Sequence, residues 1–113
     1  MGANAACVSV HNERELKEIL QVNPRVIALF YAAWCPFCIR FLPVFKRYAE
    51  QEGRSFVIVQ DDRQAMAEQY SLKVYPTVLF FESGTVSKRL DGVAGIGLDE
   101  KQLAAFVTAC PRS

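Results

Sequence analysis

Two strand-length apolar runs constrain the fold of this chain more than any other feature. Residues 25–31 (RVIALFY) and 55–60 (SFVIVQ) are rich in β-branched and aromatic side chains and show almost no polar alternation. Runs of this kind are typical of strands that are covered on both faces of a sheet. We therefore expect a central sheet with helices packed against both of its faces.

Helix signals fill the intervals between these runs. Asn12 and Glu15 resemble a capping box at the start of a helix over 12–21. A long helix is predicted from Cys35 to the breaker Gly53, and Pro43 inside it should kink it. A short helix is predicted over 61–70, and Asp99 is expected to cap a last helix.

The remaining segments predict strands. A short strand is expected at 6–10, and a hairpin of 77–82 and 86–91 is expected around the turn residues Ser83 and Gly84. In the second hairpin strand, Val86 and Leu90 should share the face opposite Ser87 and Arg89. The order of elements predicts an α/β three-layer sandwich, with a central mixed β-sheet of about five strands flanked by about four helices.

Length, composition and charge limit the class of protein. A chain of 113 residues that is 51% apolar can bury one core, so we expect a single domain over 1–113. Thirteen lysines and arginines against 12 acids give a net charge of +1, which predicts attraction neither to nucleic acid nor to anionic membranes. No apolar run approaches the roughly 18 residues of a membrane span, and the N-terminus lacks a secretory pattern. We expect a cytoplasmic monomer.

Two cysteines follow the first apolar run, in the stretch 31–43 (YAAWCPFCIRFLP). At a strand-to-helix junction they form a dithiol that can close to a disulfide and reopen. Cys35 lies where the helix begins, so unpaired backbone amides and the helix dipole favour its thiolate. Pro36 suits the first helical position. We expect Cys35 to be the nucleophile that forms a mixed disulfide, and Cys38 to be the resolving thiol.

Other uses of the cysteines are weighed beside this one. A closed zinc site needs four ligands, and the chain offers only His11 and no second CxxC, so we expect no metal and no bound cofactor. A cluster shared between two chains and an inert disulfide stay open. Cys110 falls on the apolar face of the last helix and is expected in the core, whereas the burial of Cys7 is left open.

A set of motifs carries a family resemblance. These are WCPFC at 34–38, a proline five residues after the second cysteine (Pro43), the YPT tripeptide at 75–77, the turn glycine Gly84, and Gly92, sixteen residues beyond Pro76. Over nearly its whole length the chain resembles the thioredoxin family.

The resemblance implies a thioredoxin fold and a thiol–disulfide oxidoreductase that reduces protein disulfides. It implies that Pro76 follows a cis peptide bond beside the dithiol and that the backbone of Tyr75 pairs with substrate. The implied substrate surface consists of Trp34, Pro36, Phe37, Tyr75, Pro76, Gly92, Val93 and Ala94. For Phe37, a core role is an equal alternative. The implied partners are protein disulfide substrates and a thioredoxin reductase or similar NADPH-linked donor.

The chain also departs from the family pattern. Leu29 stands where the family has a buried aspartate, and Val57 stands where its partner lysine is usual. The base for Cys38 is then lost, and we expect water or the Cys35 thiolate to replace it. Asp61 lies where thioredoxins often hold the indole of Trp34, but it could equally cap a helix.

Two further positions leave alternatives open. Pro36-Phe37 is closer to the Pro-Tyr of glutaredoxins than to the Gly-Pro of thioredoxins, so we expect a less reducing potential. Arg40 either adds a cation near the site or is a solvated surface charge. A glutaredoxin-like glutathione-dependent enzyme is the first alternative function, and Trp34 and the YPT tripeptide argue against it. A binding module that kept the fold is the second, and retention of both cysteines argues against it.

Overall fold

A mixed five-stranded sheet forms the centre of the computed structural model, which describes residues 7–112. The elements along the chain are β1 (Cys7–Val10), α1 (Glu13–Val22), β2 (Arg25–Tyr31), α2 (Pro36–Glu52), β3 (Phe56–Gln60), β4 (Thr77–Glu82), β5 (Thr85–Asp91) and α3 (Glu100–Ala109). Ala6, where the first strand was predicted to begin, lies outside the described residues.

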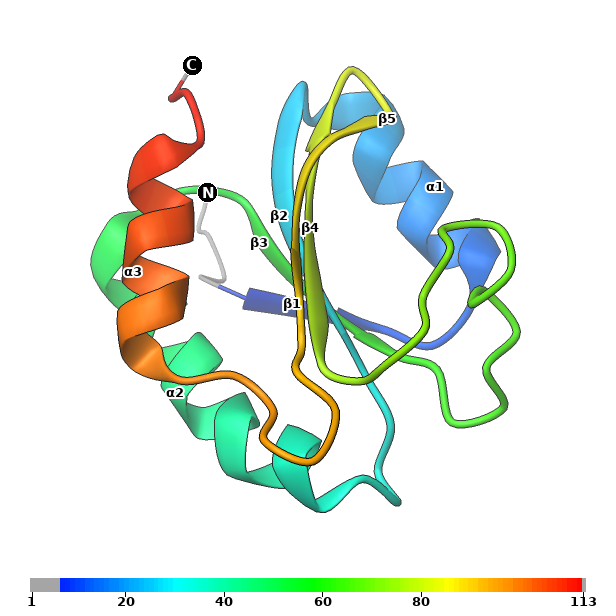
Figure 1. Cartoon of the computed structure of the whole chain (residues 1–113). Coiled ribbons are helices and arrows are strands. Elements are labelled where there is room, and N and C mark those ends of the chain that lie inside the picture. The colour runs from blue at the N-terminus through cyan, green and yellow to red at the C-terminus, as the bar shows by residue number, and fades with distance from the viewer. Residues whose placement is uncertain (1–6, 113) are drawn as a thin grey trace.

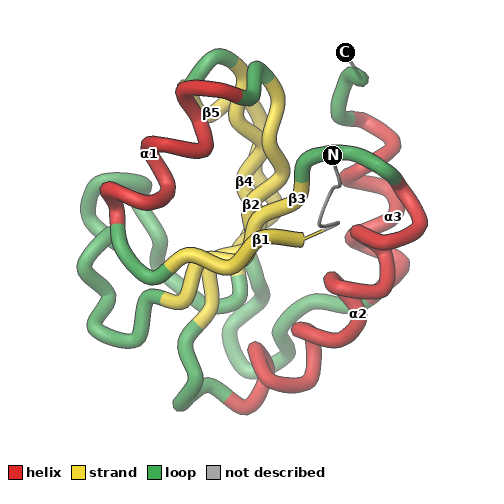
Figure 2. The backbone as a smooth tube through the Cα atoms, turned by 180° about the vertical axis from the view of Figure 1, so that it is seen from behind, coloured by secondary structure: helices red, strands yellow, loops and turns green. Residues whose placement is uncertain are grey.

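The strand order is β1-β3-β2-β4-β5, with β1, β3 and β2 parallel and β4 and β5 antiparallel. Figure 1 shows α1 on one face of the sheet and α2 and α3 on the other, and Figure 2 shows the same layers from behind. The predicted three-layer α/β sandwich with a five-stranded mixed sheet is confirmed. Three helices are present among the described residues rather than four. None of these is both long and apolar enough to cross a bilayer.

Local signals explain the helix ends. The side chain of Asn12 accepts a hydrogen bond from the backbone N–H of Glu15 at 2.9 Å, and Asp99 forms a reciprocal capping box with Gln102. Gly53 ends α2 in the left-handed region, with φ at 66°. Pro43 lies within α2, which continues on both sides of it.

The core lies in two clusters, one on each face of the sheet. From β2, Ala28 and Phe30 pack into the α1 cluster, whereas Ile27 and Leu29 pack into the cluster beneath α2 and α3. These side chains are at most 1% exposed. Full burial of a large apolar side chain contributes about 1.5–3 kcal/mol. The continuous apolar run of β2 is therefore explained by burial on both faces.

The helix predicted over 61–70 is wrong, because this segment forms consecutive turns. Within it, Gln64 has a φ of 57°, which a right-handed helix does not accommodate, and Ser71, just after it, has a φ of 54°. The carboxylate of Asp61 accepts hydrogen bonds from the N–H groups of Ala65 and Met66 at 2.8 and 3.0 Å. A side chain thus satisfies the donors that a first helical turn would leave open.

The hairpin turn at Ser83 and Gly84 is confirmed, and both residues have positive φ, at 51° and 81°. The expected alternation in β5 is wrong, because the register shifts between Phe80 and Phe81. Val86 therefore packs against the α1 cluster and Leu90 against the opposite cluster. A bulge adds one residue to a strand, so side chains beyond it point to the other face.

Candidate active site

The two thiols of the CxxC motif lie at the N-terminal end of α2. Cys35 is the N-cap and Pro36 is the first helical residue. The backbone N–H of Cys38 donates to Cys35 Sγ at 3.4 Å, and Cys35 Sγ donates to the carbonyl of Tyr75 at 3.4 Å. Cys35 is 5% exposed and Cys38 is completely buried, and both are free thiols in this structure. The sulfur of Cys35 therefore lies against a helix N-terminus and is the more accessible of the two.

Cys38 is set apart by its protonation. Burial and, to a smaller extent, the hydrogen bond with Cys35 together raise the pKa of its thiol to about 12, although a backbone hydrogen bond with Ala32 opposes the shift. At neutral pH Cys38 therefore keeps its proton. A resolving role for this residue requires a route by which the proton leaves.

The loop opposite the thiols contains the cis peptide bond Tyr75–Pro76. The loop after β5 touches it at Gly92, where a Cβ atom would lie 2.3 Å from the carbonyl oxygen of Pro76. Only glycine permits this approach of two backbones. The thiols, Pro76 and Gly92 are thus brought together from three separate segments.

The side chain of Tyr75 is buried, although it was expected to form part of the exposed substrate surface. It is 8% exposed, and its hydroxyl donates to Asp61 Oδ2 at 2.9 Å. Burial, together with this hydrogen bond to Asp61, raises the pKa of the Tyr75 phenol. The carbonyl of Tyr75, and not its ring, is the part that faces Cys35.

The indole of Trp34 is held by a residue that sequence reasoning missed. Its Nε1 donates to the carbonyl of Asp62 at 2.8 Å, and the carboxylate of Asp62 accepts from the N–H of Ala33 at 2.7 Å. The hydrogen bond from the Ala33 N–H lowers the pKa of the Asp62 carboxyl, and a hydrogen bond from the side chain of Gln60 lowers it to a smaller extent. Asp61 instead accepts hydrogen bonds from Ala65, Met66 and Tyr75, so its indole-holding role is wrong, and it caps a turn rather than the predicted helix. The two adjacent acids after β3 were a usable signal in the sequence, but they did not indicate which of the two contacts Trp34.

Leu29 and Val57 are both buried, but they do not face each other. In the register of β2 and β3, Leu29 pairs with Ile58, and Val57 pairs with Ala28. Leu29 packs beneath α2 and α3, whereas Val57 packs in the α1 cluster on the other face. The assignment of Val57 as the neighbour of Leu29 is therefore wrong, because successive strand residues alternate between faces. The neighbour on β3 is Ile58, which is also apolar.

The surface beside the thiols is apolar and larger than predicted. Trp34 is 58% and Val93 is 45% exposed, as expected for a contact surface. Phe37 is half-buried beneath Gly97, whose Cβ position lies 2.9 Å from the Cβ of Phe37. Ile39 and Ile96, at 50% and 65% exposed, were missed. Ile96 is flanked by Gly95 and Gly97, both at positive φ, and this loop-tip pattern was a usable signal.

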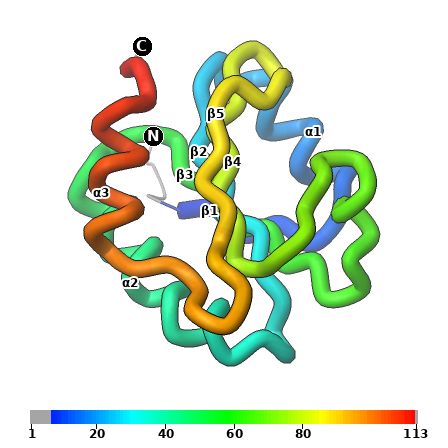
Figure 3. The backbone as a smooth tube through the Cα atoms, viewed as in Figure 1, coloured from blue at the N-terminus to red at the C-terminus, as the bar shows by residue number. Residues whose placement is uncertain are grey.

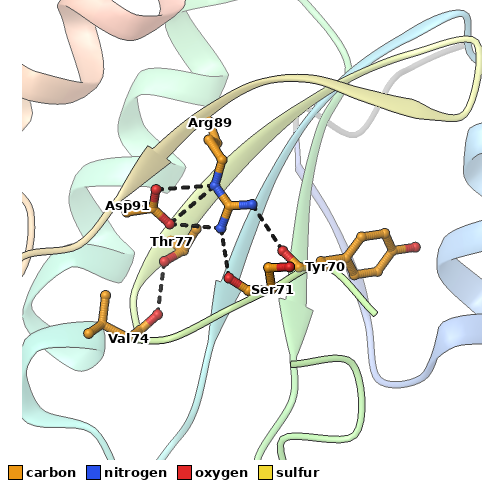
Figure 4. A network of polar contacts seen from close by, with 6 residues as sticks. All are labelled: Tyr70, Ser71, Val74, Thr77, Arg89 and Asp91. Atoms are coloured by element: carbon orange, nitrogen blue, oxygen red, sulfur yellow. Dashed lines mark hydrogen bonds and ion pairs between the residues drawn. The ribbon is translucent and has the colours of Figure 1, made fainter. Parts of the chain in front are cut away.

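An arginine fixes the segment that leads to Pro76 (Figure 4). Arg89 forms an ion pair with Asp91 at 2.8 Å and donates to the carbonyls of Tyr70 and Ser71 at 3.0 Å each. Closer to the site, Thr77 Oγ1 donates to the carbonyl of Val74 at 2.8 Å. Tyr70 and Ser71, in the segment that leads to Pro76, are therefore attached to β5 through the side chain of Arg89.

The other two cysteines are neutral thiols. Burial raises the pKa of Cys7 to about 12 and that of Cys110 to about 11. Cys110 is 3% exposed and lies in the core, as predicted, and Cys7 is half-buried against the same cluster. Neither lies at a helix N-terminus as Cys35 does, and Cys110 is the C-cap of α3.

Two thiols one helical turn apart, with one at a helix N-terminus, can form a mixed disulfide with a second molecule and then close on each other. On this α/β sandwich they define a thiol–disulfide oxidoreductase.

Comparison with known proteins agrees with that class and gives the family. The family model described as Thioredoxin matches residues 7–109. The thioredoxin of Mycoplasmoides gallisepticum is 32% identical over 85 residues, covering 74% of this chain and 85% of that protein. The chain belongs to the thioredoxin family.

Two further comparisons show the range of the similarity. Protein disulfide-isomerase A5 of Bos taurus is 31% identical over 83 residues, covering 68% of this chain but only 16% of that longer protein. The structure of N21Q mutant thioredoxin from Halobacterium salinarum NRC-1 superposes with a TM-score of 0.80 at 27% identity, covering 99% of this chain and 98% of that chain.

Proposed function

We propose that this chain reduces protein disulfides by a dithiol–disulfide cycle of Cys35 and Cys38. The Cys35 thiolate attacks one sulfur of a substrate disulfide, which forms a mixed disulfide and releases the first substrate thiolate. Cys38 then loses its proton and attacks Cys35 Sγ, which releases the second substrate thiolate and leaves a Cys35–Cys38 disulfide. The released thiolates take up protons, and the substrate gains two electrons.

The observation that carries the proposal is the environment of Cys35 Sγ. It accepts the N–H of Cys38 at the start of α2, and negative charge on the sulfur is stabilised at that position. Cys38, completely buried and with its pKa raised to about 12, is the second and not the first to react. The order of the two steps follows from this difference.

The same proposal assigns substrate contacts. The backbone of Tyr75, beside Pro76, pairs with an extended substrate segment as an added strand. Trp34, Pro36, Phe37, Gly92 and Val93 form the apolar surface around the disulfide under attack. Such a surface accepts many sequences because apolar contact carries little directional information.

Recycling requires an electron donor. We propose a thioredoxin reductase or similar NADPH-linked enzyme, acting on a cytoplasmic monomer whose single domain, 1–113, performs the whole cycle. Neither nucleic acid nor membrane takes part.

The test is reduction of insulin disulfides with NADPH and a thioredoxin reductase, and separately with glutathione. Cys35→Ser is expected to abolish activity, and Cys38→Ser to accumulate a mixed disulfide with the substrate. Cys7→Ala serves as the control and should stay active. Activity that survives in Cys35→Ser, or that depends only on glutathione, would contradict the proposal.

A further inference from the structure

The side chain of Arg40 is held in a defined position beside the active site. Its Nη2 donates to the carbonyl of Ile96 at 3.1 Å, and its guanidinium carbon lies 5.3 Å from the centroid of the Phe37 ring. Figures 1 and 3 show the loop before α3, drawn in orange, beside the N-terminal end of α2. A guanidinium fixed by a hydrogen bond and an aromatic face loses little freedom when it binds a ligand.

This cation has no acidic partner within residues 7–112. The ion pairs of the described residues use other side chains, and Arg47, farther along the same helix, pairs with Glu100 at 3.2 Å. A guanidinium has five N–H donors in a planar fork. The contact with Ile96 occupies one nitrogen of Arg40, so donors stay available for a carboxylate.

The surroundings of Arg40 are apolar and exposed. Ile39, which precedes Arg40 in α2, is 50% exposed, and Ile96, whose carbonyl accepts from Arg40, is 65% exposed. Val93, whose carbonyl accepts from the N–H of Ile96, is 45% exposed. A bound segment that covers these side chains also excludes water from the guanidinium. An ion pair formed there is stronger than one in open solvent.

The spacing fits a substrate that is held by its cysteine. The Cα of Arg40 lies about 7–8 Å beyond that of Cys35 along the axis of α2, and its guanidinium turns back to the ring of Phe37 and the carbonyl of Ile96. Two residues of an extended chain span about 6.6 Å. A residue two positions from the attacked cysteine therefore reaches Arg40.

We propose that Arg40 is a specificity-determining residue that selects disulfide substrates with an aspartate or glutamate two positions from the cysteine attacked by Cys35. The inference rests on the proposed function and adds a substrate class to it. The carboxylate accepts N–H groups of the guanidinium while neighbouring apolar residues cover Ile39 and Ile96. A neutral residue at that position leaves the guanidinium unpaired, and a lysine is repelled by it.

The test uses a series of peptides with one intramolecular disulfide, which differ only in glutamate, glutamine or lysine two positions from one cysteine, on either side of it. The value of kcat/KM is measured for the wild type and for the Arg40→Met, Arg40→Glu and Arg47→Met variants. Arg47→Met is the matched control, because it removes one exposed cation from the same helix at a position paired with Glu100.

For the wild type we expect glutamate to exceed glutamine by roughly threefold to tenfold in kcat/KM, and lysine to be poorest. The glutamate-to-glutamine ratio should fall to about one in Arg40→Met and invert toward lysine in Arg40→Glu. Arg47→Met should keep the wild-type ratio. The ratio should also shrink as salt is added.

The outcomes separate the two claims. A wild-type enzyme that reduces all three peptides equally, an unchanged ratio in Arg40→Met, or an equal loss in Arg47→Met overturns the role of Arg40 and leaves the reductase function standing. A wild-type enzyme that reduces none of the peptides contradicts the proposed function, and the role of Arg40 falls with it.

Discussion

At the residue scale, we propose that the apolar side chain of Leu29 affects how the second thiol loses its proton. It is completely buried on β2, with Ile58 beside it on β3 and Val78 on β4. Thioredoxins usually have an aspartate at this position, and here an apolar side chain packs in its place. Because burial also raises the pKa of Cys38, the thiolate that closes the cycle is scarce at neutral pH. Deprotonation of Cys38 should therefore limit resolution of the mixed disulfide.

This account predicts a pH dependence. Below its raised pKa, the thiolate fraction of Cys38 grows tenfold per pH unit, so wild-type resolution should accelerate by about the same factor. Leu29→Asp should resolve faster near pH 7 with a shallower slope, because the carboxylate accepts the proton. It should also lower the free energy of unfolding by about 3 kcal/mol or more, since a polar group replaces a buried apolar one.

Leu29→Asn is the matched control for this prediction. Asparagine has the same size as aspartate and is also polar, but its side chain cannot take up a proton. Resolution is measured in single turnovers by release of a chromogenic thiol from the mixed disulfide. Unchanged or slower resolution in Leu29→Asp, or equal acceleration in Leu29→Asn, would refute the role given to this position.

At the scale of an element, the segment 61–76 depends on side chains for its shape. Its first residues are fixed by the carboxylate of Asp61, which accepts hydrogen bonds from two backbone N–H groups and from the hydroxyl of Tyr75. Its middle is fixed by Arg89, which donates hydrogen bonds to the carbonyls of Tyr70 and Ser71. Since this segment ends at Pro76, these contacts position the loop that faces Cys35.

Arg89→Met should therefore loosen the loop while leaving the sheet intact. Two hydrogen bonds to backbone carbonyls are lost, which should lower the free energy of unfolding by about 1–2 kcal/mol. Amide hydrogen exchange over 70–76 should become faster, and KM for a protein disulfide should rise more than kcat falls. Arg89→Lys should restore only part of the effect, because an ammonium lacks the planar fork.

The exposed neighbour Lys88 provides the comparison on the same strand. Lys88→Met removes an equal charge and should leave exchange over 70–76 as in the wild type. If Arg89→Met and Lys88→Met changed exchange and KM equally, the effect would come from charge alone and not from the contacts of Arg89.

At the scale of the whole molecule, the layers could be predicted from the sequence because burial on two faces leaves a direct trace. The run that became β2 has no polar break, and the cap residues Asn12 and Asp99 lie where their helices begin. The dithiol was equally visible, because Cys35 and Pro36 match the needs of a helix N-terminus.

The features that could not be predicted depend on the direction in which individual side chains and turns point, and a sequence pattern does not indicate that direction. Asp61 and Asp62 are adjacent and chemically identical. Only the backbone conformation of the turn that begins there decides that Asp61 binds Tyr75 and Asp62 binds Trp34. A bulge near Phe80 turned the later residues of β5 to the other face. The short helix failed because side-chain caps and positive φ at Gln64 favoured turns over local helix propensity.

The central claim is that Cys35 is the reactive thiol of the molecule, and the order of alkylation tests it most directly. Fully reduced protein is treated with a limiting amount of iodoacetamide at neutral pH, and the modified residues are identified by peptide mass spectrometry. We predict modification of Cys35 first, with Cys38, Cys7 and Cys110 following only at higher pH or on unfolding, because burial raises the pKa of each. Modification of Cys38 before Cys35, or of both at equal rates, would contradict the account.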